Sequence, residues 1–192
     1  MSNLLALDLF CGAGGATKGL QRAGFTVIGV DIKPQPRYCG DAFFQADAMT
    51  FPLEGFDFIW ASPPCQHYTS MKTMPDAREH WDSIPPPRAR LETACVPYVI
   101  ENVKGAPLLS PVMLCGTMFG LGVEDAELRR HRLFESPLPI APLRCRHGNR
   151  DTLGVYGGHL RNRRRRTIGV YGEGCRDSVR KVDRGVADFT VE

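Results

Sequence analysis

Short apolar runs separated by Gly, Pro and charged residues dominate the first two thirds of the chain. Runs that are apolar without alternation are typical of parallel strands buried on both faces. The pattern predicts strands at 4–10, 25–30, 43–46, 56–61 and 98–100, with shorter ones at 112–114 and 133–135. Helices are predicted at 16–23 and, after three prolines, at 88–94. This alternation of strands and helices indicates an α/β fold.

The first strand runs into a glycine-rich turn, Cys11-Gly12-Ala13-Gly14-Gly15, and then into a helix. Glycine lets the backbone approach a ligand closely, and a helix N-terminus favours negative charge. Asp31 ends the second predicted strand about 20 residues later, where an acid binds ribose hydroxyls in nucleotide-binding folds. The pair predicts an adenosine-containing cofactor. Asp47, after the third strand, is a candidate partner for the adenine amino group.

Three candidate catalytic groups follow later strands. The fourth predicted strand ends in Ser62-Pro63-Pro64-Cys65, and the two prolines stiffen the loop that carries the thiol. Glu101 and Asn102 end the fifth strand. Arg130 and Arg132, two residues apart, are expected to point the same way from a strand and to favour a thiolate. The segment 66–86 is long and polar, which favours a lid over the site.

Charge and composition restrict the remaining possibilities. Of the chain's 192 residues 43% are hydrophobic, and no apolar run is long enough to cross a membrane. The N-terminus lacks a signal-peptide pattern and the seven cysteines are scattered, so we expect a cytoplasmic protein with reduced thiols. Residues 151–192 hold nine Lys/Arg and six Asp/Glu, so the net charge of +3 lies there. The arginine block at 161–166 favours nucleic-acid phosphate as a partner, with a solvated loop as the alternative.

The C-terminal part combines a short repeat with scattered metal-ligand types. Gly154–Gly157 and Gly169–Gly172 are both Gly-Val-Tyr-Gly, and we expect them to pair in a small hairpin. Cys145, His147, His159 and Cys175 are ligand types without a paired Cys-x-x-Cys, so no metal site is predicted. We interpret His131, between two arginines, as packed or solvated. A catalytic domain at 1–136 and a basic extension at 137–192 are the expected domains.

The ordered motifs resemble the catalytic domain of the DNA cytosine-5 methyltransferases. The matching segments, over residues 1–136, are Asp8-Leu9-Phe10-Cys11-Gly12-Ala13-Gly14-Gly15, Asp31, Ser62-Pro63-Pro64-Cys65-Gln66, Glu101-Asn102-Val103 and Arg130-His131-Arg132. The resemblance implies a Rossmann-like, mostly parallel sheet with helices on both faces (the class I methyltransferase fold). It also implies S-adenosylmethionine as methyl donor and duplex DNA as substrate, in the manner of restriction-modification enzymes.

The resemblance also implies roles for individual residues. Cys65 adds to C6 of a cytosine flipped out of the duplex, Glu101 binds N3 and the exocyclic amine, and Arg132 holds O2 with Arg130 nearby. Asn102 belongs to the Glu101 motif and is expected in the catalytic group. The implied cofactor-binding residues are Phe10, Cys11, Gly12, Gly14, Asp31, Ile32, Asp47, Ala48 and Pro64.

The sequence departs from the family pattern after residue 136. No match to the family's Asn-rich closing segment is found, so we expect a shortened form, or one completed by a second polypeptide. Two alternatives stay open: a non-catalytic or partner-dependent subunit that binds cofactor or DNA, and a methyltransferase acting on tRNA cytosine. The Ser-Pro-Pro-Cys-Gln motif favours DNA.

Overall fold

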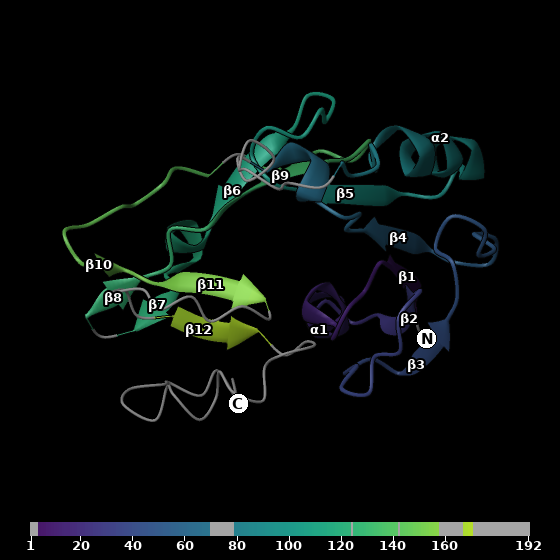
Figure 1. Cartoon of the computed structure of the whole chain (residues 1–192), viewed down its shortest axis with the longest axis horizontal. Helices are drawn as coiled ribbons and strands as arrows, with labels where there is room; N and C mark the ends of the chain where they lie inside the picture. Colours follow the sequence, from purple (N-terminus) through teal and green to yellow (C-terminus); the bar gives the residue numbers. More distant parts are fainter. Residues whose placement is uncertain (1–3, 70–78, 124, 142, 158–166, 171–192) are drawn as a thin grey trace. The chain divides into compact units, whose positions relative to one another are not determined.

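A seven-stranded sheet organises the computed structural model, which describes residues 4–69, 79–123, 125–141, 143–157 and 167–170. The strand order is β3-β2-β1-β4-β5-β9-β6 (Figure 1). Strands β1 to β5 run parallel, and β9 is antiparallel to β5. Their bounds are β1 Leu5–Leu9, β2 Thr26–Asp31, β3 Ala42–Gln45, β4 Phe58–Ala61, β5 Tyr98–Asn102, β6 Val112–Cys115 and β9 His131–Glu135. The predicted Rossmann-like α/β sheet is confirmed.

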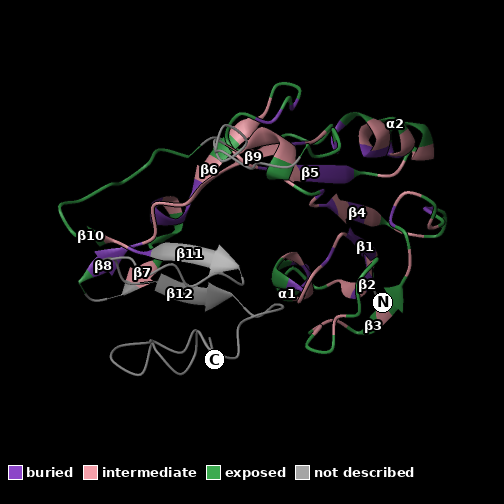
Figure 2. Ribbon diagram, viewed as in Figure 1, coloured by how far each residue is buried: buried purple, intermediate pink, exposed green. Residues whose placement is uncertain are grey.

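The two described α-helices, α1 (Gly15–Arg22) and α2 (Pro85–Ala94), pack on opposite faces of this sheet. Leu20 of α1 packs with Ala6 and Val27, which point to one face. Leu91 of α2 belongs to a larger cluster on the other face, where the alternate positions Leu7, Leu9, Val30, Ile59 and Ile100 lie. Because both faces are covered, the central strands are buried along most of their length (Figure 2). The continuous apolar runs in the sequence have this physical cause.

The strand order reverses between β1 and β4, because β2 and β3 lie on one side of β1 while β4 and β5 lie on the other. In open α/β sheets ligands bind outside the carboxyl ends of the strands at such a switch point. The turn after β1 and the loop after β4, which carries Cys65, therefore flank the place where this fold binds ligands.

A buried ion pair fixes α2 to the antiparallel strand β9. Arg88 donates from Nε and Nη2 to the two carboxylate oxygens of Glu135, both at 2.7 Å. Glu135 also accepts from the backbone N–H of Leu109 at 2.6 Å, so both of its oxygens are used. A bidentate, hydrogen-bonded pair of this kind holds its partners in one geometry, and it fixes the strand that carries Arg132.

The chain divides into two compact units, one formed by Met1–Met113 with Arg132–Pro142 and the other by Leu114–His131 with Leu143–Glu192. The second unit contains the short helix η3 (Gly116–Phe119) and the strands β7 (Gly122–Val123), β8 (Ala126–Glu127) and β10 (Asp151–Thr152). These three strands form a small sheet in the order β10-β8-β7. The expected functional division at residue 136 stays a prediction.

The repeated Gly-Val-Tyr-Gly segments do not form the expected hairpin. Strand β11 (Gly154–Gly157) pairs with β12 (Thr167–Val170), and the two run parallel. A hairpin needs antiparallel strands, so that prediction is wrong, although Gly154–Gly157 does pair with a segment that overlaps the second copy. The arginine block 161–166 lies outside the described residues. Among the helices that are described, none is long and apolar enough to cross a membrane.

Candidate active site

A cavity of about 490 Å³ lies in the first unit, at the carboxyl ends of β1, β2, β4 and β5. Every residue that lines it belongs to this unit, although the residues come from distant parts of the sequence. They are Phe10, Asp31, Ile32, Lys33, Asp47, Ala48, Met49, Ser62, Pro63, Pro64, Cys65, Gln66, Trp81, Glu101, Asn102 and Arg132. The cavity therefore combines the candidate cofactor residues with the candidate catalytic ones.

The loop that carries Cys65 is held by hydrogen bonds at three successive residues. The side-chain amide of Asn102 donates to the carbonyl oxygen of Pro63 at 2.9 Å. The hydroxyl of Ser83, which is fully buried, donates to the carbonyl oxygen of Pro64 at 2.5 Å. Trp60 donates from its ring N–H to the hydroxyl of Ser62 at 2.7 Å. Since the two prolines already restrict the backbone, these bonds leave the loop one conformation in which to present the thiol.

Glu101 and Arg132 form an ion pair in the same cavity. The guanidinium Nε of Arg132 lies 2.9 Å from a carboxylate oxygen of Glu101, and the two side chains are 21% and 17% exposed. Glu101 comes from β5 and Arg132 from β9, which are neighbouring antiparallel strands. The pair thus presents a carboxylate and several N–H donors to the cavity that contains Cys65, which suits a planar heterocycle with both donors and acceptors.

The turn after β1 has a left-handed backbone at three residues. Phe10 has φ 59°, Gly12 has φ 51° and Gly14 has φ 94°. At Gly14 a side chain is also excluded by space, because a Cβ would lie 2.7 Å from the sulfur of Cys39. At Gly12 a Cβ would meet no atom within 4 Å, so the space in front of this part of the turn is open. Such a turn brings backbone N–H groups close to a ligand.

Asp31 connects the turn to the end of β2. One carboxylate oxygen accepts from the backbone N–H of Gly12 at 3.0 Å, and the other accepts from that of Lys33 at 2.9 Å. Each oxygen keeps a second lone pair, which ribose hydroxyls can use. Asp31 therefore fixes the turn and can still bind a ligand.

The far side of the cavity is formed by Ile32 and by the turn from Asp47 to Phe51. Ile32 is 68% exposed, a large apolar surface beside the acidic group of Asp31. Asp47 accepts from the backbone N–H of Met49 at 2.8 Å. Arg90 of α2 supports this turn by donating to the carbonyl oxygens of Ala48 and Phe51 at 2.6 and 2.7 Å. An apolar surface next to two carboxylates matches the chemistry of an adenosine group.

Buried Asp8 is a functional candidate that the sequence reasoning left unassigned. One of its oxygens accepts from both the backbone N–H and the hydroxyl of Thr17, at 3.0 and 2.5 Å, which fixes the first turn of α1. Its other oxygen is buried without a hydrogen-bond partner among the residues that the structure describes. Burial raises the pKa of Asp8 to about 7, against the hydrogen bonds from Thr17, which lower it.

The two cysteines near the cavity, Cys11 and Cys65, differ in how far they are buried. Burial, with the nearby carboxylates of Asp8 and Asp31, raises the pKa of the Cys11 thiol far above its ordinary value. Cys11 is therefore a neutral thiol, whereas Cys65 lines the cavity and is partly exposed. The geometry favours Cys65 as the nucleophile.

Most predicted site residues lie together. Those that line the cavity are Phe10, Asp31, Ile32, Asp47, Ala48, Pro64, Cys65, Glu101, Asn102 and Arg132, with Cys11, Gly12 and Gly14 in the adjoining turn. Arg130 is the exception, because β9 begins at His131 and Arg130 belongs to the second unit. The predicted role of Arg130 beside Arg132 therefore stays a prediction. Lys33 and Met49 line the cavity without a sequence signal that we recognised, whereas Gln66 and Trp81 belong to the segment 66–86 that was expected to cover the site.

Known proteins give partial matches. No family model matches the chain. The type II methyltransferase M.AplI of Arthrospira platensis is 30% identical over 118 residues, a match that covers 54% of this chain and 32% of that protein. The chain thus spans about a third of the length of that curated relative.

Solved structures resemble the chain at lower identity. The DNMT2 mutant of Spodoptera frugiperda matches with 19% identity and a TM-score of 0.48, over 78% of this chain and 54% of that one. The Dnmt2 methyltransferase of S. pombe matches with 16% identity and a TM-score of 0.45, over 78% and 51% of the two chains.

Proposed function

We propose that this chain transfers a methyl group from S-adenosylmethionine to C5 of a cytosine flipped out of duplex DNA. The observation that carries the proposal is the convergence of Cys65, Glu101 and Arg132 on one cavity with the Gly turn, Asp31 and Asp47. The 30% identity to a type II methyltransferase agrees with methyl transfer. The Ser-Pro-Pro-Cys-Gln motif favours DNA over tRNA.

The cofactor side of the cavity fits S-adenosylmethionine by its own chemistry. Asp31 keeps lone pairs for ribose hydroxyls, and exposed Ile32 offers an apolar surface for adenine. Asp47 is placed for the adenine amino group, and the open space at Gly12 admits the rest of the molecule against the backbone. When bound, the cofactor supplies an electrophilic sulfonium methyl group.

The nucleophilic step belongs to Cys65. Its sulfur forms a bond to C6 of cytosine, and the electron pair of the C5–C6 double bond becomes available at C5. With the cofactor held by the Gly turn, Asp31 and Asp47, its methyl group would be the electrophile for this electron pair and its neutral thioether the leaving group. Loss of the C5 proton to solvent water and elimination of the Cys65 thiolate would then restore the ring. Pro63 and Pro64 hold the sulfur in place throughout.

Glu101 and Arg132 activate and orient the base. Glu101 hydrogen-bonds or protonates N3 and the exocyclic amine, which draws electron density from C6 and favours attack there. Arg132 donates to O2 and neutralises charge that develops on the ring. Asn102 is a positioning residue, because both of its polar atoms bond to the backbone, to Pro63 and Val103.

Label transfer tests this function directly. The full chain is incubated with methyl-tritiated S-adenosylmethionine and either duplex DNA or tRNA, beside Cys65→Ser and the control Cys95→Ser, an exposed cysteine outside the cavity. We expect label in DNA from wild type and Cys95→Ser only. Label in tRNA alone would instead support the RNA alternative. Cofactor binding without transfer to either polymer would favour the partner-dependent subunit.

Bisulfite sequencing of host DNA after expression gives the target motif. A duplex with 5-fluorocytosine at that motif should then trap the chain covalently, because fluorine at C5 cannot leave as a proton does. We expect the adduct on Cys65 by mass spectrometry. Methylation without any adduct would contradict the covalent step.

A further inference from the structure

Four metal-ligating side chains meet in the second unit, outside the candidate active site. They are Cys115, His131, Cys145 and His147, and their ligand atoms all lie within 4.8 Å of one another. Cys115 is the last residue of β6 and His131 the first residue of β9, the neighbouring strand in the sheet. Cys145 and His147 come from the irregular segment that follows. Three separate stretches of chain therefore supply two sulfur and two imidazole ligands.

We propose that these four residues bind one zinc ion in a closed, tetrahedral Cys₂His₂ site. The sulfur of Cys115 lies 3.4 Å from Nε2 of His147, and that of Cys145 lies 3.4 Å from Nε2 of His131. In a tetrahedral site with Zn–S of about 2.3 Å and Zn–N of about 2.0 Å, a sulfur and a nitrogen ligand are about 3.5 Å apart. The observed separations agree with this edge length.

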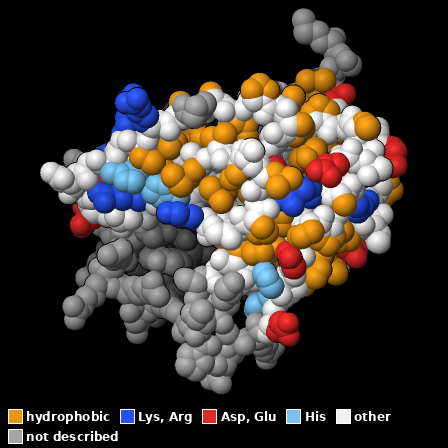
Figure 3. Space-filling model, turned by 90° about the horizontal axis from the view of Figure 1, so that it is seen from above, with side chains coloured by type: hydrophobic (Ala, Val, Ile, Leu, Met, Phe, Trp, Pro, Cys, Tyr) orange, Lys and Arg blue, Asp and Glu red, His pale blue; other side chains and the backbone are white. Residues whose placement is uncertain are grey.

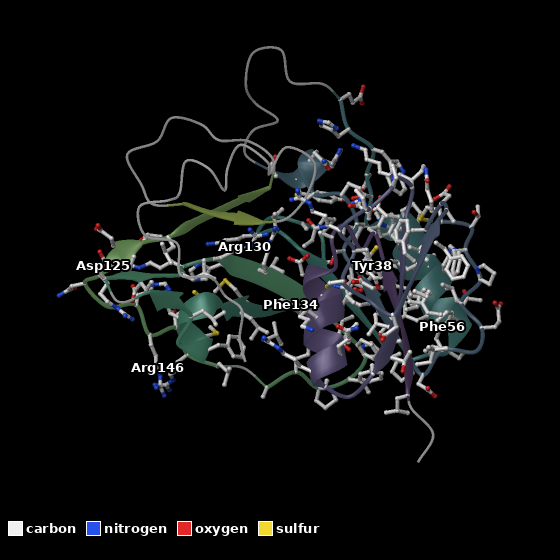
Figure 4. All side chains as sticks on the ribbon, turned by 90° about the horizontal axis from the view of Figure 1, so that it is seen from below. Tyr38, Phe56, Asp125, Arg130, Phe134 and Arg146 are labelled. Atoms are coloured by element: carbon white, nitrogen blue, oxygen red, sulfur yellow. The ribbon has the colours of Figure 1, made fainter. Side chains whose placement is uncertain are left out.

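The two histidine rings are arranged for one shared ion. Their centroids are 5.2 Å apart and their planes meet at 83°, so they do not stack. Of the two histidines, His131 is partly exposed and His147 is exposed; Figure 3 shows histidine side chains beside Lys/Arg side chains on one face of the molecule. Arg146 stands between Cys145 and His147 in the sequence, and its side chain points away from the ribbon (Figure 4). The ligand atoms of Cys145 and His147, on either side of Arg146, lie within 4.8 Å of those of Cys115 and His131.

Contacts around Cys115 support a bound thiolate. Cys115 is 2% exposed, and its sulfur lies 3.3 Å from the hydroxyl of Thr117, which can donate to it. Partners outside the ligand shell orient ligands in this way. Four protein ligands leave no open position for substrate, so the ion would be structural. It would join the ends of β6 and β9 to the segment 143–150, and the residue after ligand His131 is Arg132.

Sequence reasoning predicted no metal because no ligand pair has the usual short spacing. It grouped Cys145 and His147 with His159 and Cys175, which lie outside the described residues. Cys115 precedes His131 by 16 residues and Cys145 by 30. The sheet makes neighbours of the strands that carry Cys115 and His131, and the sequence alone does not show this, so it interprets His131 as packed or solvated. The proposal revises both expectations.

Metal analysis of the full chain, purified with zinc present and a reducing agent throughout, tests the site. After dialysis we expect about one zinc ion per chain, as in other closed four-ligand sites. Cys115→Ser and Cys145→Ser should each weaken zinc binding at least about 100-fold, since they lose a ligand rather than an outer partner. The exposed Cys95→Ser should keep wild-type stoichiometry. Zinc removal with a chelator should lower Tm, and added zinc should restore it.

Cobalt replaces zinc as a spectroscopic probe of the ligand set. Wild type should show the visible bands of tetrahedral Co²⁺ and a thiolate-to-cobalt charge-transfer band. His147→Ala should keep that band, while Cys145→Ser should lose about half of its intensity, because one of two sulfur ligands is gone. Cys145 and His147 lie in an irregular segment, so we expect their variants to fold. These two variants still test the site if the variant of the buried Cys115 fails to fold. A metal-free wild type with an octahedral cobalt spectrum would overturn the proposal, as would equal loss of zinc in Cys95→Ser.

Discussion

The side-chain amide of Asn102, at the end of β5, donates a hydrogen bond of 2.9 Å to the carbonyl oxygen of Pro63, two residues before Cys65. Asn102 is 1% exposed, and its amide oxygen accepts from the backbone N–H of Val103 at 2.8 Å. The amide therefore has a partner on each polar atom. Its structural role follows from these contacts: it ties the loop that carries Cys65 to the strand that carries Glu101.

Replacing Asn102 with Asp should keep one of its two hydrogen bonds and remove the other. The Asp carboxylate still accepts from Val103 but cannot donate to Pro63, and two oxygens then face each other in a buried place. We expect a loss of about 1–3 kcal/mol in the free energy of unfolding, measured by urea denaturation. Methyl transfer should fall in kcat, because Cys65 is no longer held. Thr93→Ala, an exposed hydroxyl on α2, is the control, and a wild-type kcat in Asn102→Asp would contradict the positioning role.

The ion pair between Glu101 and Arg132 should matter for catalysis and little for stability. Both side chains are partly exposed, so breaking the pair should cost less than about 1 kcal/mol of unfolding free energy. Glu101→Gln and Arg132→Lys should each lower kcat/KM about 100-fold or more, because the activating proton or the oriented donors are lost. Arg22→Lys, an exposed residue of α1, should leave both quantities unchanged. Large destabilisation with unchanged kcat/KM would reverse this assignment.

Gly14 and Gly15 form a matched pair for testing the turn. Gly14→Ala places a Cβ at φ 94° and 2.7 Å from the sulfur of Cys39, so it should cost at least about 1–2 kcal/mol and weaken cofactor binding. Gly15→Ala adds its Cβ to open space in the first turn of α1 and should be neutral or stabilising by up to about 1 kcal/mol. Thermal unfolding and cofactor titration distinguish them. Equal effects of the two substitutions would exclude a special role for Gly14.

The sequence predicts what depends on chain order and apolar pattern. The strands β1, β2, β4 and β5 were placed within a few residues because both faces of the sheet are covered there, which gives uninterrupted apolar runs. Cys65, Glu101 and Asp31 could be assigned to one edge because parallel strands end on the same side. Strand direction in the 154–172 repeat could not be predicted, since a four-residue copy carries no information on direction.

Contacts between residues that are far apart along the chain could not be predicted from the sequence. Ser83 supports Pro64 from 19 positions away, and the cysteine–histidine cluster joins residues 115 and 147. Neither pair has a characteristic spacing. The sequence predicts that Asp8 lies in the first strand. It does not predict the burial of Asp8 or its hydrogen bonds to Thr17, because these result from the packing of α1 on β1.

Arg90 should affect cofactor affinity without touching the cavity. It supports the turn of Asp47 and Ala48 through two backbone carbonyls, at Ala48 and Phe51. Arg90→Lys cannot span both carbonyls, so we expect about a tenfold higher Kd for S-adenosylmethionine, or about 1.4 kcal/mol. At saturating cofactor kcat should match wild type. Glu92→Gln, an exposed neighbour on α2, is the control for isothermal titration, and a kcat defect at saturation would place Arg90 in a different role.

Asp8 predicts a pH dependence of stability with a defined sign. Its pKa in the folded chain is about 7, above the ordinary value of 3.8, because burial disfavours the charged carboxylate. The folded state thus binds a proton more tightly than the unfolded state does. The stability contributed by the protonated group is fully present below pH 3.8 and is lost as pH rises through about 7.

Asp8→Asn removes this titration while keeping an oxygen that can accept from Thr17. As pH rises from 4 to 8, the unfolding free energy of wild type should therefore fall relative to that of Asp8→Asn, by up to about 4 kcal/mol. Urea denaturation at several pH values measures this difference, in which the other titrating groups cancel. Asp57→Asn is the matched control, because the exposed Asp57 also accepts from a backbone N–H, that of Leu5. A pH-independent difference for Asp8→Asn would mean that Asp8 is ionised in the folded chain at neutral pH.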